Sequence, residues 1–247
     1  MYFHTAKYFS FLYSATQEVQ QKVRLLERVL GATPKLILEI GAGDGSLSIE
    51  LSRKQHHVVS LEESSVFFAI MLTKLGAEKS IRPFFTPLPV SLENFKSNDL
   101  FDLVIATKVI SSIPAHKWPN FLNSVHERLD KGAVFIFDCS LKSDLRPDQP
   151  LQEIQKKVFG QNTLHHLAKS HVSETGDFQE ITFEYVIRRY NETIVKEEES
   201  HKVYLVNPDD IEHLLQKAGF SKVSIFGDWQ MNTLVKDSPA ALVIAYA

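Results

Sequence analysis

The residues best suited to chemistry form segment 38–45, which reads Leu-Glu-Ile-Gly-Ala-Gly-Asp-Gly. An apolar run leads into glycines at alternate positions. One carboxylate, Glu39, precedes the first glycine, and another, Asp44, follows the second. Glycine allows a tight turn and lets the backbone approach a ligand without an intervening Cβ atom. A strand that enters a glycine-rich turn and then a helix is a general cradle for cofactors. The segment therefore predicts a small-molecule site.

The glycine spacing and the charges indicate which ligand fits. Gly41, Gly43 and Gly45 follow G-x-G-x-G, whereas dinucleotide-binding enzymes use G-x-G-x-x-G. Glu39 and Asp44 would each repel a pyrophosphate by roughly a kcal/mol at partial burial, and would attract an ammonium or a sulfonium. The loop thus favours a cofactor with a cationic tail. A dinucleotide site and a ligand-free tight turn fit the pattern less well.

A third carboxylate follows the next apolar strand, residues 58–61. Glu62 stands where an acidic side chain accepts two hydrogen bonds from ribose hydroxyls. Its neighbour Glu63 is expected to point away, because side chains alternate along a strand. Together with the glycine loop, Glu62 predicts a nucleoside-containing ligand.

The elements that must position these residues alternate along the chain. Strands are expected at 35–40, 58–61, 101–106 and 133–138, and helices at 46–53, 64–75 and 118–129. Short apolar strands that alternate with helices predict a parallel sheet covered on both faces. The first thirty residues are expected to be helical, with Gly31 as the stop.

After residue 140 the pattern changes. A helix is expected at 151–168, an alternating strand at 178–190, a turn at Asn191-Glu192 and a strand at 203–206. Two strands in succession suggest an antiparallel addition. Asn207 is then expected to cap a helix that ends at Gly219, and strands are expected at 222–226 and 241–246. The prediction is one domain, residues 1–247, with a helical cap (1–33), a cofactor core (34–140), a substrate-side insertion (141–206) and a C-terminal helix with a strand pair (207–247).

Residues 36–138 and 207–247 resemble the core of class I S-adenosylmethionine-dependent methyltransferases. The resemblance implies an α/β fold: a doubly wound, seven-stranded Rossmann-like sheet with an N-terminal helical cover and an antiparallel insertion before the last helix. It also implies S-adenosylmethionine as the cofactor and S-adenosylhomocysteine as the product.

The resemblance assigns positions of this sequence to parts of the cofactor. Glu39 would hold the methionine amino group, and Glu62 would bind the ribose. Ser91 and Leu92 fall at the adenine, where many members have Asp instead of Ser91. The floor under the cofactor and the lining of its methionine portion would come from Gly41, Ala42, Gly43, Gly45, Thr107 and Lys108.

The acceptor is constrained mainly by exclusion. The net charge is −3 and no basic block occurs, so a DNA substrate is not expected. The Asn/Asp-Pro-Pro-aromatic motif of nucleobase amino-methyltransferases is replaced by segment 107–110, Thr-Lys-Val-Ile, and Cys139 follows the wrong strand for cytosine carbon methylation. With its insertion, the chain is similar to small-molecule N-methyltransferases that act on amino sugars and amino acids. The prediction is methyl transfer to nitrogen or oxygen of a small metabolite. A protein or RNA methyltransferase and a non-catalytic S-adenosylmethionine-binding protein remain as alternatives.

Candidates on the acceptor side are few. His116 is the candidate general base, because the pKa of histidine lies near neutrality. Tyr8 and Tyr13 are expected to line the substrate side. Trp118 and Phe121 are expected to pack in their helix rather than to contact a substrate. The charged run 196–199 is expected to form a solvated face or loop. Asp138 and Cys139 lie at the end of a strand, and their role stays open.

Several other features are predicted to be absent. His165, His166 and His171 lack the spacing of a closed metal site, so no metal is expected. A single cysteine excludes an intramolecular disulfide. Neither a leader peptide nor a run of about 18 apolar residues is found, which predicts a cytoplasmic protein without membrane contact. No sequence feature indicates an oligomeric state.

Overall fold

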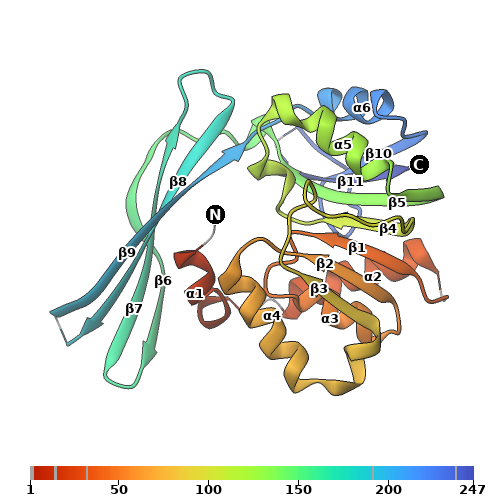
Figure 1. Ribbon diagram of the computed structural model, residues 1–247. Helices are drawn as coiled ribbons and strands as arrows, with labels where there is room; N and C mark the ends of the chain where they lie inside the picture. The colour runs from red at the N-terminus through yellow and green to blue at the C-terminus, as the bar shows by residue number, and fades with distance from the viewer. Residues whose placement is uncertain (1–2, 14–15, 32, 191, 237) are drawn as a thin grey trace.

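The computed structural model describes residues 3–13, 16–31, 33–190, 192–236 and 238–247. A mixed sheet of seven strands lies beside a separate antiparallel sheet of four strands, and helix α1 lies between the two (Figure 1). The strand order of the larger sheet is β10-β11-β5-β4-β1-β2-β3. The predicted seven-stranded α/β fold is therefore confirmed.

The centre of the larger sheet is parallel and buried. Strand β1 (Leu36–Ile40) pairs with β2 (His57–Leu61) on one side and with β4 (Phe101–Ala106) on the other. Strand β5 (Leu129–Ser140) continues the parallel order beyond β4. Since these strands run in the same direction, their carboxyl ends meet at one edge of the sheet, where ligands of open α/β folds bind.

Helices cover both faces of this sheet. On one face lie α2 (Thr16–Leu30), α3 (Ser46–Arg53) and α4 (Ser65–Ala77). On the other face lie α5 (Trp118–His126) and α6 (Pro208–Lys217). Alternate residues of β1 supply the two cores, with Ile37 facing α2 and α3 and Leu38 facing α5. Burial on both faces explains the uninterrupted apolar runs of the sequence.

Two strands at one edge of the sheet come from the C-terminal region. Strand β11 (Ala240–Tyr246) pairs antiparallel to β5, and β10 (Lys222–Phe226) pairs antiparallel to β11. At the opposite edge, β3 (Phe85–Leu88) is a strand that the sequence did not predict. Pro87 obscured it, because proline cannot donate to a sheet and is tolerated only at an edge such as this one.

Short elements complete the core. The 3-10 helices η1 (Lys79–Phe84), η2 (Ile110–Ser112) and η3 (Ala115–Lys117) connect strands and helices, and η4 (Lys142–Asp144) follows β5. Two predicted boundaries were wrong by a few residues. The helix predicted at 64–75 extends as α4 to Ala77, and the helix predicted at 118–129 ends as α5 at His126, so that Leu129 already belongs to β5.

The predicted helix at 151–168 was wrong. This segment forms most of the hairpin of β6 (Gln149–Phe159) and β7 (Asn162–Val172), which turns at Gly160 with φ of 56°. Leu151, Ile154 and Val158 recur at helical spacing but are exposed on the strand. The buried positions, Leu164 and His166, follow the period of two that a strand requires.

The hairpin continues into two longer strands. Strand β8 (Phe178–Arg189) confirms the predicted alternating strand, and β9 (Glu192–Tyr204) is much longer than the predicted 203–206. The predicted turn at Asn191-Glu192 lies partly outside the described residues, since Asn191 is not described. The charge run 196–199 belongs to β9, so it is neither a loop nor wholly solvated.

The predicted N-terminal helix forms two helices. Helix α1 (His4–Leu12) packs between the smaller sheet and α4, whereas α2 packs on the larger sheet (Figure 1). Leu12 is buried against Leu164 and Tyr185 of the smaller sheet. The N-terminal region therefore links the two sheets at the edge where the carboxyl ends of the parallel strands meet.

Candidate functional site

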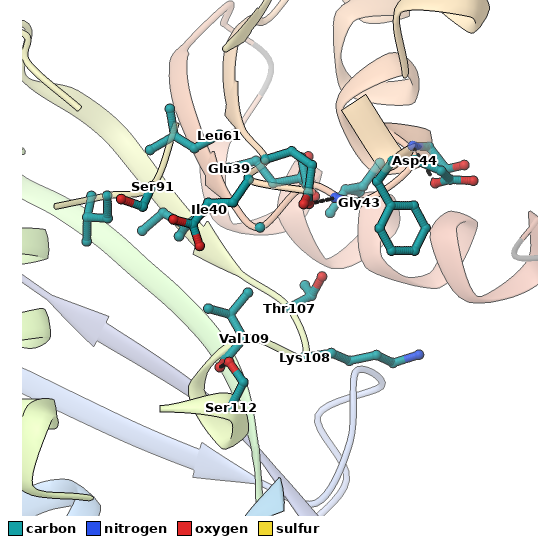
Figure 2. A pocket seen from close by; sticks show the side chains of 18 of the residues that line it. Glu39, Ile40, Gly43, Asp44, Leu61, Ser91, Thr107, Lys108, Val109 and Ser112 are labelled. Atoms are coloured by element: carbon teal, nitrogen blue, oxygen red, sulfur yellow. Dashed lines mark hydrogen bonds between the residues drawn. The ribbon is translucent and has the colours of Figure 1, made fainter. Parts of the chain in front are cut away.

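A cavity of about 520 Å³ opens at the carboxyl ends of β1, β2 and β4. Figure 2 shows Glu39 and the glycine loop on one side, with Thr107, Val109 and Ser112 opposite. The cavity brings together all ten predicted cofactor residues except Gly45, which packs beneath the loop. The lining residues that the sequence did not single out include Thr5, Phe9, Glu18, Val19, Lys22, Ser46, Leu47 and Phe67.

The glycine loop needs glycine for two separate reasons. Gly41, Gly43 and Gly45 all have φ between 57° and 74°, in the left-handed region that other residues avoid. A Cβ atom at Gly41 would lie 2.5 Å from Val109 Cγ2, and one at Gly45 would lie 2.6 Å from Met71 Cγ. At Gly43 a Cβ atom would meet only open space. The loop thus packs closely against Val109 and Met71 and is open at Gly43.

Glu39 is the most unusual ionisable group of the cavity. Its side chain is buried, and it accepts a hydrogen bond from Ser48 Oγ, which also contacts Ser60 Oγ. No lysine or arginine among the described residues forms an ion pair with it. Burial raises the pKa of Glu39 to about 7, against the opposing effects of Ser48 and Lys22. A buried carboxylate in this state fits a cationic ligand group, which would stabilise the ionised form.

Glu62 organises the loop as well as facing the cavity. One carboxylate oxygen accepts from the backbone N–H of Gly43 at 2.7 Å, and the other accepts from the N–H of Ser64 at 2.7 Å. Each oxygen keeps a free lone pair for a hydroxyl donor. Burial raises the pKa of Glu62 above its usual range, and the two backbone hydrogen bonds oppose that shift. Glu63 was predicted to point away from the site; it is exposed, and it also borders the cavity.

The sequence predicted that Asp44 would repel a phosphate, and the structure corrects this prediction. Its carboxylate pairs with Lys74 Nζ at 2.6 Å, so the negative charge is already balanced. The expected repulsion of a phosphate therefore applies mainly to Glu39.

A cluster of charges that the sequence did not reveal lies beside Glu39. Glu18 accepts from Lys22 Nζ at 2.8 Å and lies 3.1 Å from Lys108 Nζ. Lys22 is buried, and its ammonium group lies over the ring of Trp229. Lys22 occupies a position of α2 that shares its face with Val19 and Leu26. A lysine at such a position was the available signal, since lysine is rarely buried without a function or a partner.

The loop after β4 is fixed by Asp138, whose role the sequence left open. One carboxylate oxygen accepts from the backbone N–H of Lys108, and the other accepts from Trp229 Nε1 at 3.3 Å. Lys108 has φ of 57°, so this strained turn depends on an external acceptor. Thr107 and Lys108 line the cavity, and Ser91 and Leu92 line its far end. Cys139 is buried, and burial raises its pKa to about 12.

His116 does not reach the cavity. It is exposed in η3 and is absent from the lining, so the geometry gives no support for it as a general base. Trp118 packs in the core as predicted, with Nε1 donating to the carbonyl of Ile113. Phe121, for which packing was preferred over contact with a substrate, also lines the cavity.

Tyr8 and Tyr13 face the smaller sheet instead of lining the cavity. Tyr8 stacks on Tyr185 at 4.9 Å and donates to Glu197, and the Tyr13 hydroxyl lies 3.1 Å from His166 Nδ1. Other residues of α1, Thr5 and Phe9, take the predicted place in the cavity wall.

Two histidines of the group excluded as a metal site make local contacts. His165 lies 2.5 Å from Glu153 and His171 lies 2.7 Å from Asp148. Both histidines belong to β7, and His165 therefore does not lie on the predicted helix. Across the described ranges, no group of three His, Cys, Asp or Glu side chains is arranged to hold a metal ion.

Among the helices of the described residues, none is long and apolar enough to cross a membrane.

A family model described as a methyltransferase domain matches residues 13–225, most of the chain. The chain belongs to this methyltransferase family. It is an S-adenosylmethionine-dependent methyltransferase of class I, as the glycine loop predicted, and S-adenosylmethionine is its cofactor. No curated protein sequence matches the methyltransferase significantly.

Solved structures share the fold of the methyltransferase at low sequence identity. The CcbJ methyltransferase from Streptomyces caelestis is 12% identical with a TM-score of 0.80, covering 98% of this chain and 96% of that one. An S-adenosylmethionine-dependent methyltransferase from Clostridium acetobutylicum is 13% identical with a TM-score of 0.73, and the match covers 98% of this chain and 95% of that one. CalS10 from Micromonospora echinaspora is an amino pentose methyltransferase whose structure contains S-adenosylmethionine. It is 13% identical with a TM-score of 0.73, and the match covers 100% of this chain and 98% of that one.

Proposed function

We propose that this methyltransferase transfers a methyl group to a nitrogen or oxygen atom of a small metabolite by in-line displacement. The observation that carries the proposal is the cavity of about 520 Å³ between the glycine loop and α1. Cavities of roughly 300–1,000 Å³ are typical of small-molecule sites. A folded protein or an RNA strand would need a wider surface beside the glycine loop, where Thr5 and Phe9 of α1 stand.

The residues of the cavity fit the parts of the cofactor. We assign the methionine amino group to Glu39, its carboxylate to Lys22 and the ribose hydroxyls to Glu62. Lys22 suits the carboxylate because it is a buried cation next to Glu39. Ser91 and Leu92 would border the adenine, and the open side of Gly43 would face the cofactor.

The cofactor supplies a methyl group already activated on a sulfonium, so the protein contributes chiefly orientation and exclusion of water. Thr107 and the turn at Lys108 would border the methionine portion, while Thr5 and Phe9 would exclude solvent from the opposite side. An uncharged amine can attack without a dedicated base, which agrees with the position of His116 outside the cavity. The likeness of the fold to CalS10, an amino pentose methyltransferase, supports an amino sugar as the first acceptor to test.

Two measurements test the proposal in sequence. Calorimetry with S-adenosylmethionine and S-adenosylhomocysteine is expected to give binding at one site, and absence of binding by both would refute the cofactor site. Transfer of labelled methyl is then measured with amino sugars, amino acids, other metabolites, peptides and RNA. Labelling of a small metabolite supports the proposal. Efficient labelling of only peptides or only RNA would refute the small-molecule acceptor.

A further inference from the structure

Helix α1 takes its N-terminal cap from a strand far along the chain. The residue at its own cap position, Phe3, provides no side-chain hydrogen bond. Instead, the two carboxylate oxygens of Glu199 in β9 accept from the backbone N–H groups of Phe3 at 2.6 Å and Thr5 at 2.8 Å. A carboxylate at this end of a helix satisfies free N–H groups and interacts favourably with the helix dipole. The first turn of α1 is therefore stabilised by the smaller sheet.

A second carboxylate of β9 holds the following turn. Glu197 accepts from Tyr8 Oη and Lys7 Nζ, both at 2.7 Å, and lies 3.2 Å from His4 Nδ1. Glu197 and Glu199 point to the same face because side chains alternate along a strand. Their side chains are only 20% and 10% exposed, so these contacts are screened less than ordinary surface ion pairs.

The other side of α1 forms a wall of the cavity. Thr5 and Phe9 lie one helical turn apart and both line it. Thr5 connects the two sides, because its Oγ1 accepts from Tyr185 Oη at 3.0 Å and lies 3.3 Å from His201 Nε2. Phe9 contacts Phe67 of α4 edge to face, with ring centroids 5.4 Å apart. The position of this wall thus depends on contacts with β8, β9 and α4.

We propose that Glu199, assisted by Glu197, is a positioning residue for methyl transfer. Neither carboxylate lines the cavity. They fix α1 on the smaller sheet so that Thr5 and Phe9 close over the donor and confine the acceptor beside it. This inference rests on the proposed function, because it requires donor and acceptor to occupy the cavity. Small displacements of positioning groups are costly in displacement reactions, of the order of 100-fold for about 1 Å.

The experiment compares Glu199→Ala and Glu199→Gln with Glu198→Gln in the full-length protein. Glu198 is the matched control, since it is exposed on the other face of the same strand and carries the same charge. Three quantities are measured: hydrogen exchange of the α1 amides, the dissociation rate of S-adenosylhomocysteine, and kcat with the acceptor found by the labelling screen. Exchange of the β1 and β4 amides reports separately on the integrity of the core.

We expect Glu199→Ala to accelerate exchange in α1 and to raise the dissociation rate about 10-fold, with kcat reduced 10- to 100-fold and core exchange unchanged. Glu199→Gln, which keeps one acceptor oxygen, should fall between Glu199→Ala and the wild type. It also carries the test if Glu199→Ala does not fold. The inference is overturned if both Glu199 variants match Glu198→Gln in dissociation rate and kcat, even when α1 exchanges faster. Failure of the wild type to bind S-adenosylhomocysteine would instead refute the proposed function.

Discussion

The buried carboxylate of Glu39 gives the sharpest test of the proposed cofactor site, because it affects stability and binding in opposite directions. In the free protein, burial raises its pKa from 4.5 to about 7. The folded state therefore binds this proton more tightly than the unfolded chain does. The resulting stabilisation is complete below about pH 4.5 and is lost as the pH rises through about 7.

The magnitude follows from the shift in pKa. Each pKa unit corresponds to 1.36 kcal/mol, so a change from 4.5 to about 7 amounts to about 3 kcal/mol. Glu39→Gln stays uncharged at every pH, and its amide can still bond to Ser48. We expect the unfolding free energy of ligand-free Glu39→Gln, relative to the wild type, to rise by about 3 kcal/mol between pH 4 and pH 8. Urea denaturation at both pH values measures this difference.

Binding should change in the opposite sense. An ammonium group that binds Glu39 stabilises the carboxylate, and losing one partner of a buried charge pair costs about 2–3 kcal/mol or more. Glu39→Gln should therefore weaken binding of S-adenosylhomocysteine roughly 30- to 150-fold at pH 8. The wild type, about half protonated at pH 7, should release about half a proton on binding. Calorimetry in buffers of different ionisation enthalpy measures that release.

The control for these measurements is Glu127→Gln, which removes an exposed carboxylate at the end of α5. It should change neither the pH dependence of unfolding nor the affinity. The reasoning about Glu39 would be refuted if Glu39→Gln retained wild-type affinity, or if its stability relative to the wild type did not rise between pH 4 and pH 8.

Three further variants test individual assignments. Glu62→Ala removes the acceptor of the Gly43 and Ser64 N–H groups and should weaken S-adenosylhomocysteine binding at least 10-fold; unchanged affinity in calorimetry would show that Glu62 is misassigned. Lys22→Met keeps the buried stem and removes the ammonium group, so the affinity should fall about 10-fold for S-adenosylhomocysteine but little for adenosine, which lacks the carboxylate. An equal loss for both ligands would contradict the assignment of Lys22. His116→Ala should leave kcat within a factor of two across pH 6–8, and a 100-fold loss would restore His116 as a catalytic base.

The donor side of the site was predictable because its determinants are local in the sequence. The strand 36–40, the glycine loop and Glu62 lie within 27 consecutive residues, and the parallel sheet brings their ends together without further information. The positive φ angles of the loop already require glycine at positions 41, 43 and 45, and close contacts add to that requirement at Gly41 and Gly45. Lys22 was missed because helical spacing was used to identify an apolar face, and the lysine that shares this face with Val19 and Leu26 was not considered.

The acceptor side was less predictable because its determinants are distant contacts. The spacing of Leu151, Ile154 and Val158 satisfies a helix, and only pairing with β7 makes the segment a strand. The acidic run 196–199 has the composition of a solvated segment. Its alternate members are nevertheless turned toward α1, and no local pattern announces a helix cap supplied by Glu199 from 194 residues away.

This contrast has a functional consequence for the two halves of the cavity. A loop defined by backbone geometry tolerates few substitutions, since a Cβ atom at Gly41 or Gly45 would lie within 2.6 Å of a neighbouring side chain. A wall held by side-chain hydrogen bonds from a separate sheet can shift when a few of those side chains change, while the glycine loop stays in place. The arrangement therefore allows the α1 wall to change its shape through the smaller sheet while the glycine loop keeps its own conformation.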